Sequence, residues 1–168
     1  MATADGTRYG STTLARVRLG HVCTQRAMMS FDTNIVVYSA NEDSSQNEAA
    51  RAFLKTLGTR DDVVICELML IEVFLKLCNG KIFRHPMTSR EAGQYCQRLR
   101  ENRNWRVVES APVMDAVWKW TRKRDFAFRR VIDTRLGLTL RHYGVVEFAT
   151  TNPKDFESLG FQRTWNPL

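Results

Sequence analysis

Three acidic side chains of this sequence stand in apolar surroundings, where an unpaired carboxylate is costly. They are Asp32, Glu72 and Asp133. A fourth polar group, the segment 150–155 that ends in Asp155, directly follows an apolar run. Clustered Asp and Glu without partnering His or Cys suit Mg²⁺ or Mn²⁺ rather than zinc. A carboxylate-held ion of this kind commonly hydrolyses phosphate esters, because it activates water and stabilises the leaving oxygen.

Each of these residues also has an ordinary structural explanation. Asp32 follows an apolar run and can form an Asx-turn or cap a helix. Glu72 and Lys76 are four residues apart, so on a helix they can form an ion pair. Asp133 near a helix start interacts favourably with the helix dipole, and Asn152 can cap a helix. The residues alone therefore leave both the structural and the metal-binding interpretation open.

The signatures of several other catalytic classes do not occur in the sequence. It contains no GxxxxGK[ST] loop, no GxGxxG fingerprint and no serine-nucleophile elbow. A small-molecule phosphohydrolase with Asp32 as nucleophile is one alternative. That chemistry usually requires a second acid two residues later, and this position is Asn34. Failure to hydrolyse a generic phosphate ester would exclude this class.

The elements that must position these residues alternate between strands and helices. Short apolar runs predict strands at 28–31, 62–66, 105–109 and 145–150. Helical spacing predicts helices over 45–57, 67–78, 88–99, 112–120 and 128–143, with a short one from Pro153. The pattern is typical of an α/β fold with three layers, α/β/α, around a mainly parallel sheet. In such folds sites form beyond the carboxyl ends of the strands.

Local signals define two of the helix ends. Ser45 with Glu48, and Thr88 with Glu91, have the spacing of a capping box. Gly58, as a residue that tolerates positive φ, is expected to end the first of these helices.

The chain has 168 residues and a net charge of +7, so we expect one domain with an anionic partner, nucleic acid first. Residues 1–27 carry four arginines, one acid and no apolar period. They fit a transit peptide or an unstructured extension, and we favour the extension, with the domain over 28–168.

No apolar run is long enough for a membrane span. The four cysteines lack CxxC spacing, which indicates reduced thiols and a cytoplasmic protein.

A basic and aromatic stretch precedes Asp133. Residues 119–130 hold six basic side chains and one acid. Basic residues interleaved with aromatic ones suit single-stranded RNA, through phosphate contacts and stacking. We expect the aromatic residues to belong mainly to the core or to an interface. The predicted RNA-binding residues are Arg122, Lys123, Arg124, Arg129 and Arg130.

The order and spacing of four motifs resemble the PIN-domain ribonucleases, and more narrowly the VapC-type toxins of bacterial toxin–antitoxin systems. The resemblance covers about residues 28–163. The motifs are Phe31-Asp32-Thr33-Asn34, Leu70-Ile71-Glu72, Ile132-Asp133-Thr134, and Thr150-Thr151-Asn152-Pro153-Lys154-Asp155-Phe156.

The resemblance implies an endoribonuclease that depends on Mg²⁺, or on Mn²⁺ as a substitute, and is inhibited by a small antitoxin. We also expect a homodimer. Carried over by position, Asp32, Glu72 and Asp133 match the first three acids. Asp32 and Asp133 would make the principal metal contacts, with Glu72 direct or through water. The fourth acidic position of the family is Asn152 here, so Asp155 is the nearby acid that would complete the catalytic set. The supporting residues would be Asn34, Thr151 and Asn152.

A second function of a different class is a non-catalytic RNA-binding module that keeps these acids for structural reasons. Cleavage of a short RNA separates the two. Asp32→Asn abolishes metal-dependent cleavage in an enzyme and changes nothing in a binding module.

Overall fold

A parallel sheet organises the fold in the computed structural model, which describes residues 27–168. Its strands are short, and those at its centre are largely buried, because helices cover both faces of the sheet. Strands β1 (Met29–Phe31), β4 (Glu147–Ala149) and β5 (Arg163–Trp165) pair in that order, and β2 (Val64–Cys66) pairs with β3 (Arg106–Val108). An isolated parallel bridge between Met29 and Val63 joins the two parts. The resulting order is β3-β2-β1-β4-β5, and all pairings are parallel.

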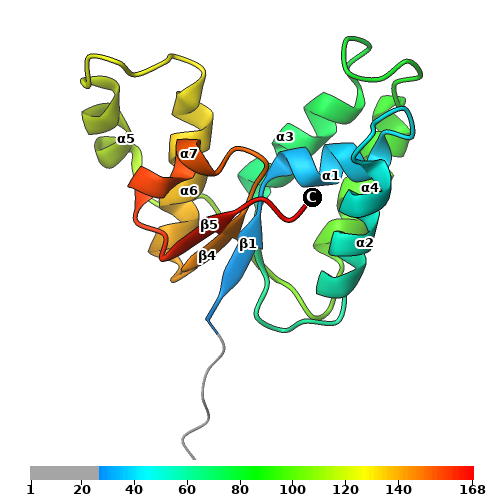
Figure 1. Cartoon of the computed structure of the whole chain (residues 1–168), viewed down its shortest axis with the longest axis horizontal. Helices are drawn as coiled ribbons and strands as arrows, with labels where there is room; N and C mark the ends of the chain where they lie inside the picture. The colour runs from blue at the N-terminus through cyan, green and yellow to red at the C-terminus, as the bar shows by residue number, and fades with distance from the viewer. Residues whose placement is uncertain (1–26) are drawn as a thin grey trace, which may run out of the picture.

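The helices form two groups on opposite sides of this sheet (Figure 1). One group contains α1 (Thr33–Ala40), α2 (Asn47–Leu57), α3 (Glu67–Leu77) and α4 (Ser89–Arg100). The other contains α5 (Met114–Thr121), α6 (Arg130–His142) and α7 (Pro153–Phe156), which continues into a 3₁₀ turn, η1 (Glu157–Leu159). The predicted three-layer α/β architecture is confirmed.

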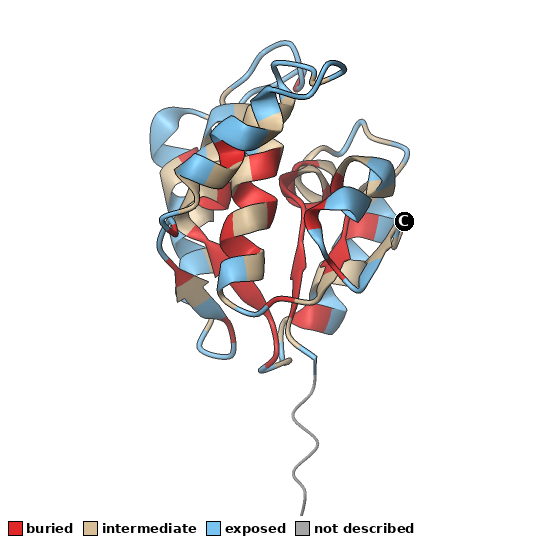
Figure 2. Ribbon diagram, turned by 90° about the vertical axis from the view of Figure 1, so that its left-hand side faces the viewer, coloured by how far each residue is buried: buried red, intermediate tan, exposed pale blue. Residues whose placement is uncertain are grey.

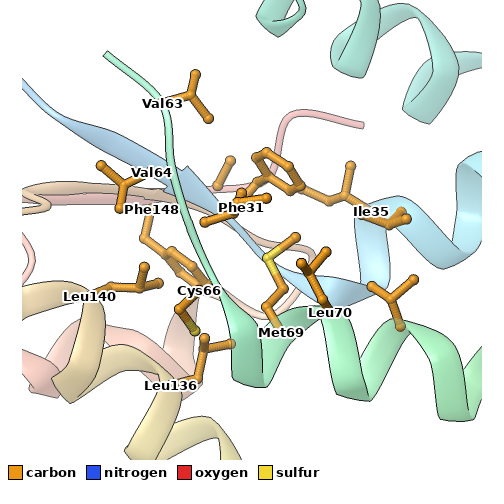
Figure 3. Close-up of a cluster of buried hydrophobic side chains, with 14 of the residues drawn as sticks. Phe31, Ile35, Val63, Val64, Cys66, Met69, Leu70, Leu136, Leu140 and Phe148 are labelled. Carbon is orange, nitrogen blue, oxygen red and sulfur yellow. The ribbon is translucent and has the colours of Figure 1, made fainter. Parts of the chain in front are cut away.

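The core lies between the sheet and these two helix layers (Figures 2 and 3). Phe31 on β1 and Phe148 on β4 are both fully buried. Met69 on α3 packs there from one layer and Leu136 on α6 from the other. These contacts fix the starts of α3 and α6 relative to the ends of β1 and β4, which is where the acidic residues lie.

The predicted elements agree with the observed ones except in two places. Helix α1 was not expected, because residues 33–40 are rich in β-branched side chains that favour strands. It forms because Asp32 caps its first turn and because Ile35, Val36 and Val37 are buried against the core. The edge strand β5 was also not expected, and its three residues carry little periodic signal.

The two predicted capping boxes have different outcomes. Thr88 and Glu91 form one at the start of α4, with both reciprocal hydrogen bonds present. The prediction at Ser45 was wrong, since α2 begins two residues later and its N-cap residue, Gln46, makes no side-chain cap bond. Gly58 ends α2, as predicted, and lies in the right-handed helical region with φ −56°.

Helix α3 has only three charged residues, a composition that predicts burial on nearly all sides, but this prediction is wrong. Ile71 is 57% exposed and Leu75 is 62% exposed, so one apolar stripe of α3 faces outward. Among the described residues no helix is both long and apolar enough to cross a membrane. Residues 1–26 lie outside the description, so the predicted extension stays a prediction.

Candidate active site

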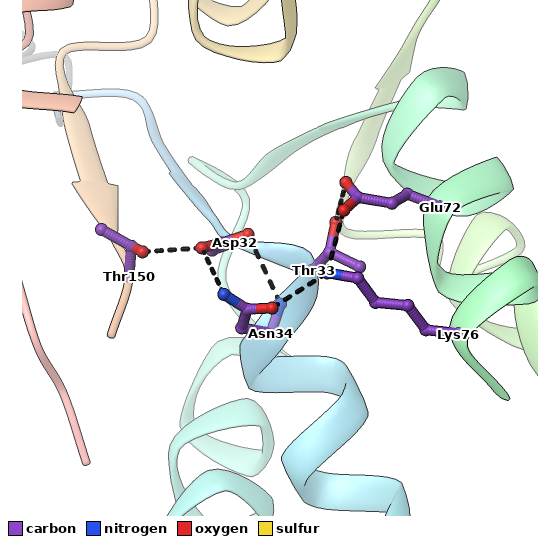
Figure 4. A network of polar contacts seen from close by, with 6 residues as sticks. All are labelled: Asp32, Thr33, Asn34, Glu72, Lys76 and Thr150. Carbon is purple, nitrogen blue, oxygen red and sulfur yellow. Dashed lines mark hydrogen bonds and ion pairs between the residues drawn. The ribbon is translucent and has the colours of Figure 1, made fainter. Parts of the chain in front are cut away.

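Asp32 occupies the carboxyl end of β1 and caps α1. It is only 4% exposed, and its backbone N–H donates to the carbonyl of Ala149 at 2.8 Å, which extends the pairing of β1 with β4. Three donors hold its carboxylate (Figure 4). The hydroxyl of Thr150 donates to Oδ2 at 2.7 Å, the side-chain amide of Asn34 donates to Oδ2 at 3.2 Å, and the Asn34 backbone N–H donates to Oδ1 at 3.4 Å. Both oxygens are thereby oriented.

Thr150 is a site residue that the sequence reasoning missed, since it selected Thr151. The register pairs Phe31 with Ala149, so the next residues of the two parallel strands, Asp32 and Thr150, are neighbours. Thr150 is fully buried, and its hydroxyl oxygen also accepts the backbone N–H of Asn152 at 3.0 Å. Knowledge of the register between β1 and β4 would have been enough to identify Thr150 as the neighbour of Asp32.

Glu72 lies on the second turn of α3 with both carboxylate oxygens engaged by protein donors. The hydroxyl of Thr33 donates to Oε2 at 2.9 Å, and the ammonium of Lys76 lies 2.9 Å from Oε1. The same ammonium donates to Oδ1 of Asn34 at 2.9 Å. The ion pair that the four-residue spacing allowed is therefore present, and it links α3 to the Asp32 side of the site.

Asp133 lies in the first turn of α6, as its sequence position predicted. Burial is the main cause that raises its pKa to about 6, and the negative charges of Asp32 and Glu72 raise it further. The charge of Lys76 acts in the opposite direction. Burial also raises the pKa of Asp32, against the lowering effects of the Thr150 hydrogen bond and of Lys76. Asp133 thus belongs to the same electrostatic cluster as Asp32 and Glu72.

A hollow of about 400 Å³ opens beside this cluster, between α3 and α6. Glu72 and Asp133 line it together with two cations, Lys76 and Arg129, and with Asn34. Its remaining walls are apolar side chains, namely Leu68, Ile71, Leu75 and Ile132. The hollow has room for an anionic chain to reach the carboxylates. Such a chain would be repelled unless cations offset the negative charge of these carboxylates.

The fourth acid, Asp155, lies on α7 and is drawn toward α6 by Arg130. Nη2 of Arg130 donates to the Asp155 backbone carbonyl at 2.6 Å, and its Nε lies 3.6 Å from Oδ1. The negative charge of Asp155 contributes to the raised pKa of Asp133, so the two acids are close enough to interact. Asn152 caps α7 without a side-chain cap bond, and its side chain is exposed.

The basic stretch covers the end of α5 and the loop that leads into α6. Arg122, Lys123, Arg124 and Arg129 are exposed, whereas Arg130 is engaged with Asp155 as described. Phe128 is 79% exposed and Trp118 is 52% exposed, so these two are not core residues, and their place in an interface stays a prediction. Trp120 is half-buried, and the Lys123 ammonium lies 3.2 Å from its ring centre.

The donor chemistry of the cluster fits a divalent cation held by two carboxylates. Across residues 27–168 no three His, Cys, Asp or Glu side chains are grouped as the ligands of one metal ion. Both oxygens of Glu72 accept from protein donors, one of them the charged Lys76. Asp32 accepts only from the uncharged Thr150 and Asn34, and its carboxylate and that of Asp133 are hard oxygen donors. Mg²⁺ is commonly bound through one or two carboxylates while it keeps several waters, so this pair suits it.

Comparison with known proteins connects this site to a family. No protein-family profile matches the chain. Ribonuclease VapC24 of Mycobacterium tuberculosis, from strains CDC 1551 and H37Rv, is 45% identical over 141 residues, which cover 84% of this chain and 97% of VapC24.

Two solved structures share the fold at 17% sequence identity, each with a TM-score of 0.57. VapC20 of Mycobacterium tuberculosis, described as a sarcin-ricin loop cleaving toxin, matches over 79% of this chain and 95% of its own. FitAcB from Neisseria gonorrhoeae matches over 83% of this chain and 98% of its own. The identity to VapC24 over nearly its whole length, together with this shared fold, shows that the chain belongs to the VapC family of PIN-domain ribonuclease toxins.

Proposed function

We propose that this chain is the toxin of a toxin–antitoxin pair and hydrolyses RNA phosphodiester bonds at the cluster of Asp32, Glu72 and Asp133, with Mg²⁺ or Mn²⁺ as cofactor. The observation that carries the proposal is the convergence of the three acids from β1, α3 and α6 beside one hollow, which Glu72 and Asp133 line together. Burial and the charges of Asp32 and Glu72 raise the pKa of Asp133 to about 6, in agreement with this placement. A fold keeps like charges together in a half-buried place when a bound cation offsets them.

Asp32 and Asp133 would hold the ion, with Glu72 acting through water or through Lys76. When bound, a divalent ion supplies a water of lowered pKa and polarises the phosphate. The protein supplies orientation. Thr150 and Asn34 fix the rotation of the Asp32 carboxylate, since both side chains donate to Oδ2 and the Asn34 backbone N–H donates to Oδ1. Asp155, in this scheme, contributes through water from α7.

The substrate would enter across the exposed basic loop. Arg129 lines the hollow beside Asp133, and the cations at 122–124 extend the positive surface away from it. Phosphate contacts by such side chains supply affinity without sequence selection, and the exposed rings of Phe128 and Trp118 offer surfaces on which bases can stack. Among the residues predicted to contact RNA, Arg130 is the least suited, because its guanidinium already donates to the backbone carbonyl of Asp155.

A homodimer and a small antitoxin complete the proposal, and the protein would act in the cytoplasm. The exposed apolar stripe of Ile71 and Leu75 on α3, together with Ile132 on α6, lines the same hollow as Glu72 and Asp133, so it supports the antitoxin as a cover that blocks the site, since contiguous exposed apolar surface marks protein contacts. Light scattering on the full chain would show a dimer, and Leu75→Glu would weaken antitoxin binding without changing that dimer. A wild-type monomer would contradict the dimer.

Cleavage of a labelled single-stranded RNA tests the activity itself. Wild type with Mg²⁺ should cleave, and chelation of the metal should stop it. Asp32→Asn should abolish cleavage while retaining RNA binding, because Asn still caps a helix and accepts the Thr150 bond. Asp43→Asn, at an exposed loop position, is the matched control and should cleave normally. Binding without cleavage by wild type would instead establish a non-catalytic RNA-binding module.

Expression of the full chain in bacteria tests the toxin role. Growth should stop, co-expression of the cognate antitoxin should restore it, and the Asp32→Asn chain should be harmless. Unimpaired growth with folded wild-type protein would contradict the toxin assignment.

A further inference from the structure

The ammonium of Lys76 lies inside the acid cluster rather than in solvent. It is held at 2.9 Å by Oε1 of Glu72 on its own helix and at 2.9 Å by Oδ1 of Asn34 on α1 (Figure 4). The Lys76 side chain is 26% exposed, and it lines the hollow that Asp133 also lines. An exposed helical ion pair spans one helix only and stabilises it by a few tenths of a kcal/mol. The contact with Asn34 fixes this ammonium from a second element.

Glu72 in turn is fixed by Lys76 and Thr33, so its role differs from that of the other two acids. Both of its oxygens accept from protein donors. Those of Asp32 accept from uncharged groups, Thr150 and Asn34, which orient a carboxylate without neutralising it. Lys76 is thus the cation that is bonded within the cluster, whereas Arg129 lines the hollow from an exposed position.

Charge balance follows from this arrangement. Three carboxylates and one ammonium leave a formal charge of −2 in the cluster, which one divalent ion neutralises. Asp155 does not change this count, because Arg130 pairs with it. An ammonium group has three N–H donors, and Glu72 and Asn34 account for two of them. The third N–H of the Lys76 ammonium can donate a hydrogen bond to an anionic oxygen in the hollow.

We propose that Lys76 is the fixed second cation of the cleavage site. Its ammonium contacts the phosphate that is cleaved, and its pairing with Glu72 limits the cluster to one divalent ion. This inference rests on the proposed function, and it adds a substrate contact and a metal stoichiometry to it.

Metal stoichiometry tests the proposal without any activity measurement. Mn²⁺ is titrated into the metal-free full chain by calorimetry and by electron paramagnetic resonance. Wild type should bind one Mn²⁺ per chain, and Lys76→Met should bind two, because Glu72 is released and the cluster charge becomes −3. Lys81→Met, in an exposed loop, should bind one. Two ions on wild type, or one on Lys76→Met, would overturn the proposal.

Cleavage kinetics test the phosphate contact. Lys76→Met should lower kcat about 100-fold with KM changed less than threefold, as when a group that stabilises developing charge is removed. Lys76→Arg should recover part of kcat, because it keeps the charge. Wild-type kcat in Lys76→Met would overturn the proposal, as would no recovery in a folded Lys76→Arg. If the wild-type chain binds no Mn²⁺, both the role of Lys76 and the proposed metal-dependent function are refuted. If it binds Mn²⁺ but Lys76→Met behaves as wild type, only the role of Lys76 is refuted.

Discussion

Replacement of Asp133 by Asn should make the metal-free protein more stable at neutral pH. The pKa of Asp133 is about 6 in the folded protein, against 3.8 as its ordinary value, so the folded chain resists ionisation of this group. The folded state therefore binds more protons than the unfolded state between these two values, and stability falls as the pH rises through that window. The penalty is absent below about pH 4 and complete above about pH 6.

The size of the effect follows from the shift. One pKa unit corresponds to about 1.4 kcal/mol, so a shift of about two units sets an upper bound near 3 kcal/mol. Asp133 is only half-buried, and solvent screening reduces this to about 1–2 kcal/mol. For a chain of this size each kcal/mol raises Tm by roughly 2–4 °C. Asp133→Asn should thus raise Tm by about 2–8 °C at pH 7.5 in a chelator.

Thermal unfolding followed by circular dichroism at pH 7.5 and pH 4 measures the difference. The gain should nearly vanish at pH 4, where both chains carry a neutral side chain at this position. Saturating Mg²⁺ should then stabilise wild type and leave Asp133→Asn almost unchanged, because binding to the folded state raises apparent stability. Asp43→Asn should show no gain at either pH. A loss of stability at pH 7.5, or a gain that persists at pH 4, would refute the electrostatic explanation.

Three further predictions concern other parts of the molecule. Thr150→Val should lower the free energy of unfolding by about 1–3 kcal/mol in urea denaturation, since the buried Asp32 loses a donor, and Thr150→Ser should restore it. Alanine at 122–124 should reduce the slope of log RNA affinity against log salt by about two units in fluorescence anisotropy, and an unchanged slope would place RNA elsewhere. Thr88→Ala should cost about 1 kcal/mol of stability through the lost cap of α4, whereas Ser45→Ala should cost almost nothing.

The acidic residues could be located from the sequence because each follows a rule about one element. A polar residue directly after a buried strand lies at the carboxyl edge of a parallel sheet, and the structure has Asp32 at that edge. An acid at the start of an apolar helix identified Asp133. Helix α1 was missed because the local propensity of its residues favours a strand. The helical conformation is stabilised instead by the burial of Ile35 and Val36 against the core.

The contacts between elements could not be predicted, because they depend on register and on helix placement. Thr150 becomes a partner of Asp32 only through the pairing of β1 with β4. Lys76 was recognisable as a partner of Glu72 from spacing, but its bond to Asn34 depends on how α3 packs on α1. The exposed stripe of α3 was missed for the same reason, since apolar composition does not reveal which face is left uncovered.

The single bridge between Met29 and Val63 has a consequence for how substitutions far from the acids affect the site. Within residues 27–168 it is the isolated bridge that connects β1-β4-β5 to β2-β3, supported by the Met29 N–H bond to the Asp62 carbonyl at 2.9 Å. Asp32 and Thr150 belong to the first part, whereas Glu72 and Lys76 follow from the second through α3. The seam between the two parts of the sheet therefore separates the residues of the cluster, and we expect a substitution at Val63 to shift Glu72 and Lys76 relative to Asp32 and Thr150 while every acid stays the same.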